Sequence, residues 1–167
     1  MTRLLAAVLG SSLMVAGSAM AQAPAAPAPP PRASYGESLT LDMAKKVVAG
    51  AEAEAAKNGW NMAIAVVDTG SNLVVLHRMD QTQLGSLRLA EGKAHTALEF
   101  RRPSRFMQDA VTAGGVGNWW LGVPGVVALE GGVPILVGGK VAGAIGVSGA
   151  AAAQDAQTAQ AGADALK

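Results

Sequence analysis

The spacing of apolar and polar residues changes several times along the chain, and each period predicts a different element. Apolar residues recur every three or four positions from Leu41 to about Asn58, which is the spacing of one buried helix face. Thr40 precedes this predicted helix at the N-cap position, and Gly59 follows it where a C-terminal glycine belongs. The same reasoning predicts further helices over residues 84–102, 103–111 and 150–167.

Short apolar runs, several of them rich in β-branched residues, lie between the helices and predict strands. They occupy residues 62–68, 73–79, 126–129, 133–137 and 141–147. Turn residues from Thr69 to Asn72 join the first two strands, and Gly138-Gly139 joins the last two as a two-residue hairpin. This order of elements predicts an α/β (α+β) fold, with helices packed on a mainly antiparallel sheet of about five strands.

The first 21 residues follow a pattern of their own. A positive charge at Arg3 precedes an apolar run from Leu4 to Ala16, and small residues stand at Ala19 and Ala21. A charged start, a short apolar centre and a small-x-small end are typical of a secretory signal peptide. We therefore expect cleavage after Ala21.

Residues 22–34 are rich in proline and alanine, which predicts an extended linker. The remaining residues 35–167 have the length of a single domain. We therefore expect an exported protein, periplasmic or secreted, that is not inserted in a membrane once the signal peptide is removed.

Charge and composition narrow the classes of function. Cleavage of residues 1–21 removes one of the 13 basic residues, Arg3, which leaves 12 against 12 acidic residues. A net charge near zero, without a basic face, argues against nucleic acid as a partner and favours self-association. The chain has no cysteine, so disulfides, thiolate metal sites and a cysteine nucleophile are excluded.

Three sequence blocks carry a resemblance to a known family. They are Arg78-Met79-Asp80, Lys93-Ala94-x-Thr96-Ala97, and the run from Gly131 to Gly149 with Gln154-Asp155 after it. In this order, from about Leu39 to the end, they resemble the GlcG/HbpS family of haem-binding (haem-degrading) proteins, which is related to the C-terminal domain of PduO-type proteins. The resemblance implies a profilin-like fold, haem as the cofactor and a homo-oligomer. The chain departs from the family at Gln81-Thr82, where members usually carry Gly-Ala, so we expect a different loop there.

Few residues are available to hold a haem iron, because the chain has only two histidines. His77 and Met79 alternate onto one face of the predicted strand, while Arg78 faces the other way. His77 and Met79 are therefore candidate iron ligands, at most one of them for a given iron. Arg78 or Lys93 is a candidate partner of a haem propionate. The alternative interpretation is a rim position for His77 and a core-filling role for Met79.

The second histidine, His95, shares a helical stripe with Glu91 and Glu99 at spacings of four. Either Glu–His pair suits a divalent ion, and a solvated stripe is the alternative. His95 joins His77 as a candidate metal ligand. The resemblance also makes Thr96 a candidate haem-pocket residue, and His95 a candidate contact in a pocket or between subunits.

Trp119, Trp120 and Leu121 lie in a glycine-rich segment from Gly114 to Gly125. Apolar side chains in such a segment predict either a cover over a planar ligand or an oligomer contact.

These observations leave three hypotheses of function. The leading one is an exported haem- or tetrapyrrole-binding protein that sequesters, senses or helps to degrade haem. The second is an enzyme or binding protein for a small organic acid or other metabolite, held by Arg78, Asp80 and Lys93. The third is an oligomeric accessory protein without a ligand. The sequence names no catalytic residue.

Overall fold

The computed structural model describes residues 31–167. The predicted signal peptide and most of the predicted linker lie outside the described residues. The elements are α1 (Leu41–Asn58), β1 (Ala63–Asp68), β2 (Leu73–Arg78), α2 (Gly85–Phe100), α3 (Arg105–Ala113), the 3₁₀ helix η1 (Gly115–Gly122), β3 (Gly132–Val137), β4 (Lys140–Ser148) and α4 (Ala152–Asp164).

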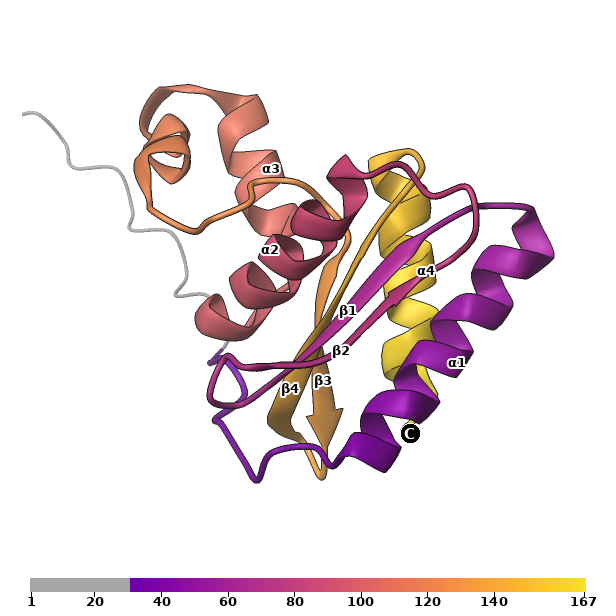
Figure 1. Ribbon diagram of the computed structural model, residues 1–167. Helices are drawn as coiled ribbons and strands as arrows, with labels where there is room; N and C mark the ends of the chain where they lie inside the picture. Colours follow the sequence, from indigo (N-terminus) through magenta and orange to yellow (C-terminus); the bar gives the residue numbers. More distant parts are fainter. Residues whose placement is uncertain (1–30) are drawn as a thin grey trace, which may run out of the picture. The chain divides into compact units, whose positions relative to one another are not determined.

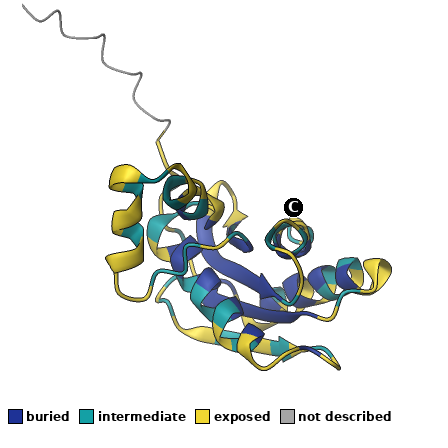
Figure 2. Cartoon of the chain, turned by 90° about the horizontal axis from the view of Figure 1, so that it is seen from above, coloured by how far each residue is buried: buried dark blue, intermediate teal, exposed yellow. Residues whose placement is uncertain are grey.

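The four strands form one antiparallel sheet in the order β2-β1-β4-β3. Helices α1 and α4 pack on one face of this sheet and α2 packs on the other, so the domain has two hydrophobic cores (Figure 1). The central strands β1 and β4 lie buried between these helix layers, whereas the outer strand β2 is only partly covered (Figure 2). The predicted mixed α/β fold, with helices packed on an antiparallel sheet, is confirmed.

Helix α1 forms as its sequence pattern predicts. The Thr40 hydroxyl accepts a hydrogen bond from the Met43 backbone N–H at 3.3 Å, and Gly59 ends the helix at φ 69° in the left-handed region. Its apolar stripe is buried against the sheet and α4, and the buried residues are Ala44, Val47, Val48, Ala51 and Ala55.

The β1–β2 hairpin is closed by its turn residues. The Asp68 carboxylate accepts hydrogen bonds from the backbone N–H groups of Gly70 (2.9 Å) and Asn72 (2.8 Å). The backbone hydrogen bond from Asn72 is the main reason that the pKa of the Asp68 carboxyl lies below its usual range. Ile64 pairs with His77 across this hairpin, which fixes the face of the sheet on which His77 lies.

Helix α2 lies very close to the sheet through small residues. Ala90, Ala94 and Ala97 are fully buried on its inner face. A side chain at Gly146 of β4 would collide with the backbone oxygen of Ala90, so this position requires glycine. The narrow small-residue face predicted for this helix therefore has a direct structural role.

The predicted fifth strand, residues 126–129, is wrong. This segment joins no ladder in the described residues, because the Val127 N–H donates to the Thr96 hydroxyl at 2.9 Å instead of to a neighbouring strand. The sheet accordingly has four strands. The glycine-rich segment before it contains η1, which the sequence pattern did not predict.

The residues that precede α1 are hydrogen-bonded to α2 and to β4. The Tyr35 hydroxyl donates to the backbone oxygen of Leu98 in α2 at 2.9 Å, and the Val141 N–H donates to the oxygen of Ser34 at 2.9 Å.

Within residues 31–167, every helix is too short or too polar to cross a lipid bilayer.

Candidate functional site

A polar cavity of about 400 Å³ opens beside the outer strand β2. Its lining joins the end of β2 to α1 and to the approach to β1. The lining residues are Glu52, Asn61, His77, Arg78, Met79 and Asp80. Four of the six are the consecutive residues 77–80, and they include the whole first block of the family resemblance. The sequence pattern did not indicate Glu52 or Asn61, because neither belongs to a recognisable motif.

His77 is the accessible donor of this cavity. It lies on the α1 face of the sheet, as its pairing with the core residue Ile64 requires. Its Nε2 atom is 3.6 Å from a carboxylate oxygen of Glu52 on α1, and 37% of the His77 side chain is exposed. The imidazole is therefore oriented by a carboxylate on one side and open to solvent on another.

Met79 shares this face with His77, as the alternation along the strand predicts. It packs against the core between the sheet and α1, and its backbone N–H donates to the Met62 oxygen at 3.0 Å. A methionine with these contacts fills the core, which was the alternative interpretation of its position.

Arg78 points to the opposite face and closes the following loop. Its guanidinium donates to the backbone oxygen of Thr82 from Nη2 at 2.8 Å and from Nε at 3.3 Å. The buried Thr82 hydroxyl in turn donates to the Met62 oxygen at 3.1 Å, and Gln81 adopts a left-handed φ of 64°. Gln81 and Thr82, where the chain departs from the family pattern, therefore form a loop held by its own hydrogen bonds.

Lys93 lies elsewhere, in the interior of the domain. Only 2% of its side chain is exposed, and its ammonium donates to Asp155 Oδ2 at 2.7 Å and to the Val147 backbone oxygen at 3.0 Å. Burial raises the pKa of the Asp155 carboxyl, and the hydrogen bond from Lys93 opposes this effect. The buried pair joins α2 to the start of α4 and does not meet Arg78 or Asp80 at the cavity.

His95 is engaged on both ring nitrogens. Its Nδ1 lies 2.8 Å from the Ser71 hydroxyl oxygen, and its Nε2 lies 3.7 Å from Glu91 Oε1. The Ser71 hydroxyl also lies 3.1 Å from Glu99 Oε1, so the predicted Glu91–His95–Glu99 stripe is present and is tied to the β1–β2 turn. Residues 31–167 contain no group of three or more His, Asp or Glu side chains arranged to hold a metal ion.

Thr96 is a buried structural residue in this arrangement. Its hydroxyl donates to the Gly92 oxygen at 2.8 Å and accepts from the Val127 N–H, and 1% of the residue is exposed. It holds the segment after η1 against α2.

The two tryptophans have opposite environments. Trp120 packs edge-on against Phe100, with ring centroids 5.0 Å apart, and against Phe106 at 6.2 Å. Trp119 is 77% exposed, and Leu121 beside it is 69% exposed. Trp120 therefore anchors η1 to α2 and α3, while Trp119 and Leu121 present an apolar surface to solvent.

The fold defines a mixed α/β protein with helices packed on both faces of a four-stranded antiparallel sheet. The model of the family described as "Haem degrading protein HbpS-like" matches residues 39–164, and the chain belongs to this HbpS-like family.

Its similarity to individual proteins agrees with this assignment. The chain is 40% identical to Protein GlcG of Escherichia coli strain K12 over 110 residues, which cover 66% of this chain and 81% of GlcG. It is similar to the crystal structure of HbpS, with a TM-score of 0.72 and 32% identity over 80% of this chain and 94% of HbpS. It is also similar to the crystal structure of a PduOC:haem complex, with a TM-score of 0.71 and 25% identity over 78% of this chain and 96% of that one.

Proposed function

We propose that this protein binds haem in the cavity beside β2, with His77 as the iron ligand. The observation that carries the proposal is the contrast between the two histidines. Each has a carboxylate near Nε2, but His77 lines a cavity, whereas Nδ1 of His95 is within hydrogen-bond distance of the Ser71 hydroxyl. Membership in the HbpS-like family, and the haem that a structural relative binds, support haem as the ligand.

The residues of the cavity fit this ligand chemically. Histidine is a common axial ligand of haem iron, and the protein tunes the iron through that ligand and its surroundings. A metal-bound imidazole usually directs its other nitrogen to a carboxylate, and Glu52 lies beside Nε2 of His77. The Nδ1 atom of His77 has no hydrogen-bond partner among residues 31–167, so in this proposal it is the nitrogen available to the iron. Arg78 also lines the cavity, and the guanidinium donors that do not hold the Thr82 oxygen supply the positive charge that a propionate requires.

Haem supplies redox chemistry and binds small molecules when it is present. The protein would supply the residue that holds the iron and an open cavity through which haem enters and leaves. A cavity at the edge of the domain is open to exchange, which suits sequestration, sensing or delivery for degradation. In this proposal the mature protein is periplasmic or secreted. N-terminal sequencing of the exported product checks this part, with Gln22 expected as the first residue, and an uncleaved Met1 would contradict it.

The proposal includes a homo-oligomer formed through η1. Val116, Trp119 and Leu121 are each more than two-thirds exposed, and the domain carries a near-zero net charge. Light scattering after gel filtration tests it. We expect the double variant Trp119→Ser/Leu121→Ser to be smaller than the wild type, and equal masses would refute the role of η1.

A small organic acid is the second candidate ligand for the same cavity. The observation in its favour is that the lining combines Arg78 and Asp80 with other polar groups. Lys93 does not support this candidate, because its ammonium group is buried in the pair with Asp155.

Titration of the purified protein with hemin tests the proposal. We expect a saturable, shifted Soret band that His77→Ala removes and that His95→Ala, the matched control, leaves in place. A band lost only in His95→Ala would transfer the ligand role to the other histidine. The absence of any saturable band would reject haem and leave the organic acid as the candidate ligand.

A further inference from the structure

A second cavity lies at the opposite edge of the sheet, beside β3. Its volume is about 300 Å³, at the lower end of the range for small-molecule sites. The strand residues Val133, Pro134 and Leu136 form its floor, and Leu136 is 44% exposed. Because β2 and β3 are the two outer strands, this cavity is separate from the one that His77 lines.

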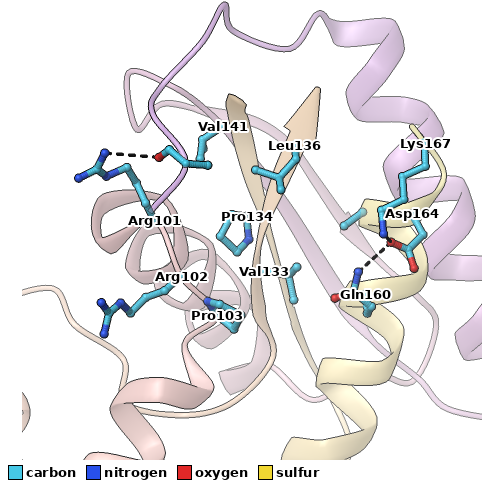
Figure 3. Close-up of a pocket in the computed structure, with 12 residues that line it drawn as sticks. Arg101, Arg102, Pro103, Val133, Pro134, Leu136, Val141, Gln160, Asp164 and Lys167 are labelled. Atoms are coloured by element: carbon cyan, nitrogen blue, oxygen red, sulfur yellow. Dashed lines mark hydrogen bonds and ion pairs between the residues drawn. The ribbon is translucent and has the colours of Figure 1, made fainter. Parts of the chain in front are cut away.

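The wall at the end of α2 carries two arginines without acidic partners. Arg101 and Arg102 line the cavity, and neither forms an ion pair with any residue in the range 31–167. Their guanidinium groups rest on aromatic rings, Arg101 5.3 Å from the Tyr35 ring centroid and Arg102 3.8 Å from that of Phe106. In Figure 3 both side chains extend from the end of α2 away from the strand residues, and the Arg101 guanidinium donates to the backbone oxygen of Ala33 at 3.4 Å.

The surroundings of Arg102 make the charged form of its guanidinium less favourable. Partial burial, and secondly the nearby charge of Arg32, lower the pKa of the Arg102 guanidinium. Arg102 therefore lies near a second positive charge, that of Arg32, and neither of these arginines forms an ion pair with a carboxylate among residues 31–167. An anion bound at the rim would offset this positive charge.

The charged side chains on the opposite wall, at the C-terminal end of α4, are paired with one another. The Lys167 ammonium lies 2.6 Å from Asp164 Oδ1, and the Gln160 side-chain N–H donates to the same oxygen at 2.8 Å. Figure 3 shows these three residues across the strand residues from the arginines. The uncompensated charge of the cavity is thus positive and lies at the arginine rim.

The strand edge itself is unsuited to pairing with another strand. The Gly132 N–H points away from β4, because it donates to the Ser104 hydroxyl at 2.8 Å. Backbone groups alternate along a strand, so Pro134 occupies the next outward position, where it has no N–H to donate. This edge therefore favours a small ligand over an added β-strand.

We propose that this cavity is a binding site for a free organic anion, a carboxylate or sulfonate with an apolar body. The apolar body lies on Val133, Pro134 and Leu136, and the anionic group is held by Arg101 and Arg102 at the rim. The site goes beyond the proposed haem function, because it uses neither His77 nor the β2 edge.

Two fluorescent probes test the site in the full-length purified protein. Anilinonaphthalene sulfonate has an apolar body with an anionic group, and phenylnaphthylamine has a similar body without the charge. We expect saturable binding of the sulfonate. The double variant Arg101→Gln/Arg102→Gln should weaken it about tenfold or more and leave the uncharged probe unchanged, because charge-assisted hydrogen bonds are worth about that factor.

Matched variants locate the binding. Leu136→Asp should abolish binding of both probes, and since the Leu136 side chain is exposed, its circular dichroism and melting temperature should remain those of the wild type. Arg88 is an exposed arginine on α2, and the variants Arg88→Gln and His77→Ala should bind the sulfonate normally.

Sulfonate binding that is unchanged in Arg101→Gln/Arg102→Gln would overturn the proposal. Loss of binding only in Trp119→Ser would also overturn it, because the probe would then be on η1. A failure of the hemin titration would leave these results unaffected, so the two proposals fail separately.

Discussion

Two acid–base pairs in this domain join similar groups in opposite surroundings. Lys93 and Asp155 meet at 2.7 Å in the interior, with 2% and 3% of their side chains exposed. His77 and Glu52 meet at 3.6 Å at the edge of the sheet, with 37% and 46% exposed. The buried pair holds α2 to α4 and is closed to solvent, whereas the edge pair includes a histidine that solvent reaches. Membership of a family motif therefore does not by itself identify a ligand-binding residue.

The largest expected effect comes from breaking the buried pair. Lys93→Met leaves the Asp155 carboxyl buried without its partner, which should reduce the free energy of unfolding by about 3–5 kcal/mol. The double variant Lys93→Met/Asp155→Leu should recover much of this loss, since no charge is left buried. Denaturant unfolding of the wild type, the single variant and the double variant measures these free energies. A loss below about 1 kcal/mol in Lys93→Met would contradict the structural role.

Substitution of Thr96 should also reduce the free energy of unfolding, by a smaller amount. Thr96→Val leaves the Val127 N–H without its acceptor, which should cost about 1–3 kcal/mol. Thr112→Val is the control, because the exposed Thr112 hydroxyl also donates four residues back, to the Gln108 oxygen, but accepts no loop N–H. Equal losses in the two variants would show that the Val127 bond contributes little.

The buried carboxyl should also give stability a specific pH dependence. The folded-state pKa of Asp155 is raised, so the folded protein holds this proton more tightly than the unfolded chain. The stabilisation is therefore fully present below the ordinary pKa of 3.8 and is lost as pH rises through the folded-state value. Unfolding free energies measured from about pH 4 upward should decline less steeply in Asp155→Asn than in the wild type. Identical slopes would be inconsistent with a raised pKa.

The edge pair should show the reverse balance between stability and binding. Glu52→Gln should change the free energy of unfolding by less than about 1 kcal/mol, because exposed ion pairs contribute little. It should weaken hemin binding roughly tenfold, since a carboxylate beside a metal-bound histidine orients that ligand. Denaturant unfolding and hemin titration of the same variant measure the two quantities. A large loss of stability with unchanged hemin binding would show that the Glu52–His77 pair stabilises the fold and does not assist binding.

The elements that local spacing determines could be predicted from the sequence. Helix α1 with its caps at Thr40 and Gly59, and both hairpin turns, follow from patterns within a few residues. The segment 126–129 has strand-like composition, but its hydrogen bond goes to Thr96, which is remote in the sequence. A tertiary contact of this kind leaves no local pattern from which the error could have been detected.

The candidate site was predictable in part for the same reason. Alternation along β2 correctly put His77 and Met79 on one face and Arg78 on the other. The partner of Lys93 lies 62 positions away at Asp155, so spacing alone did not reveal that the lysine is buried. Glu52 reaches His77 across the α1–β2 interface, and only the folded structure joins them.

The proposed role of His77 as the iron ligand is tested most directly by the spectrum of the ferric haem complex. We expect the absorption and electron paramagnetic resonance spectra of His77→Ala to lose the signature of the wild-type axial ligand, and added imidazole to restore it. His95→Ala should keep the wild-type spectra. If His77→Ala binds hemin with spectra identical to those of the wild type, the iron is held by another residue and His77 is not its ligand.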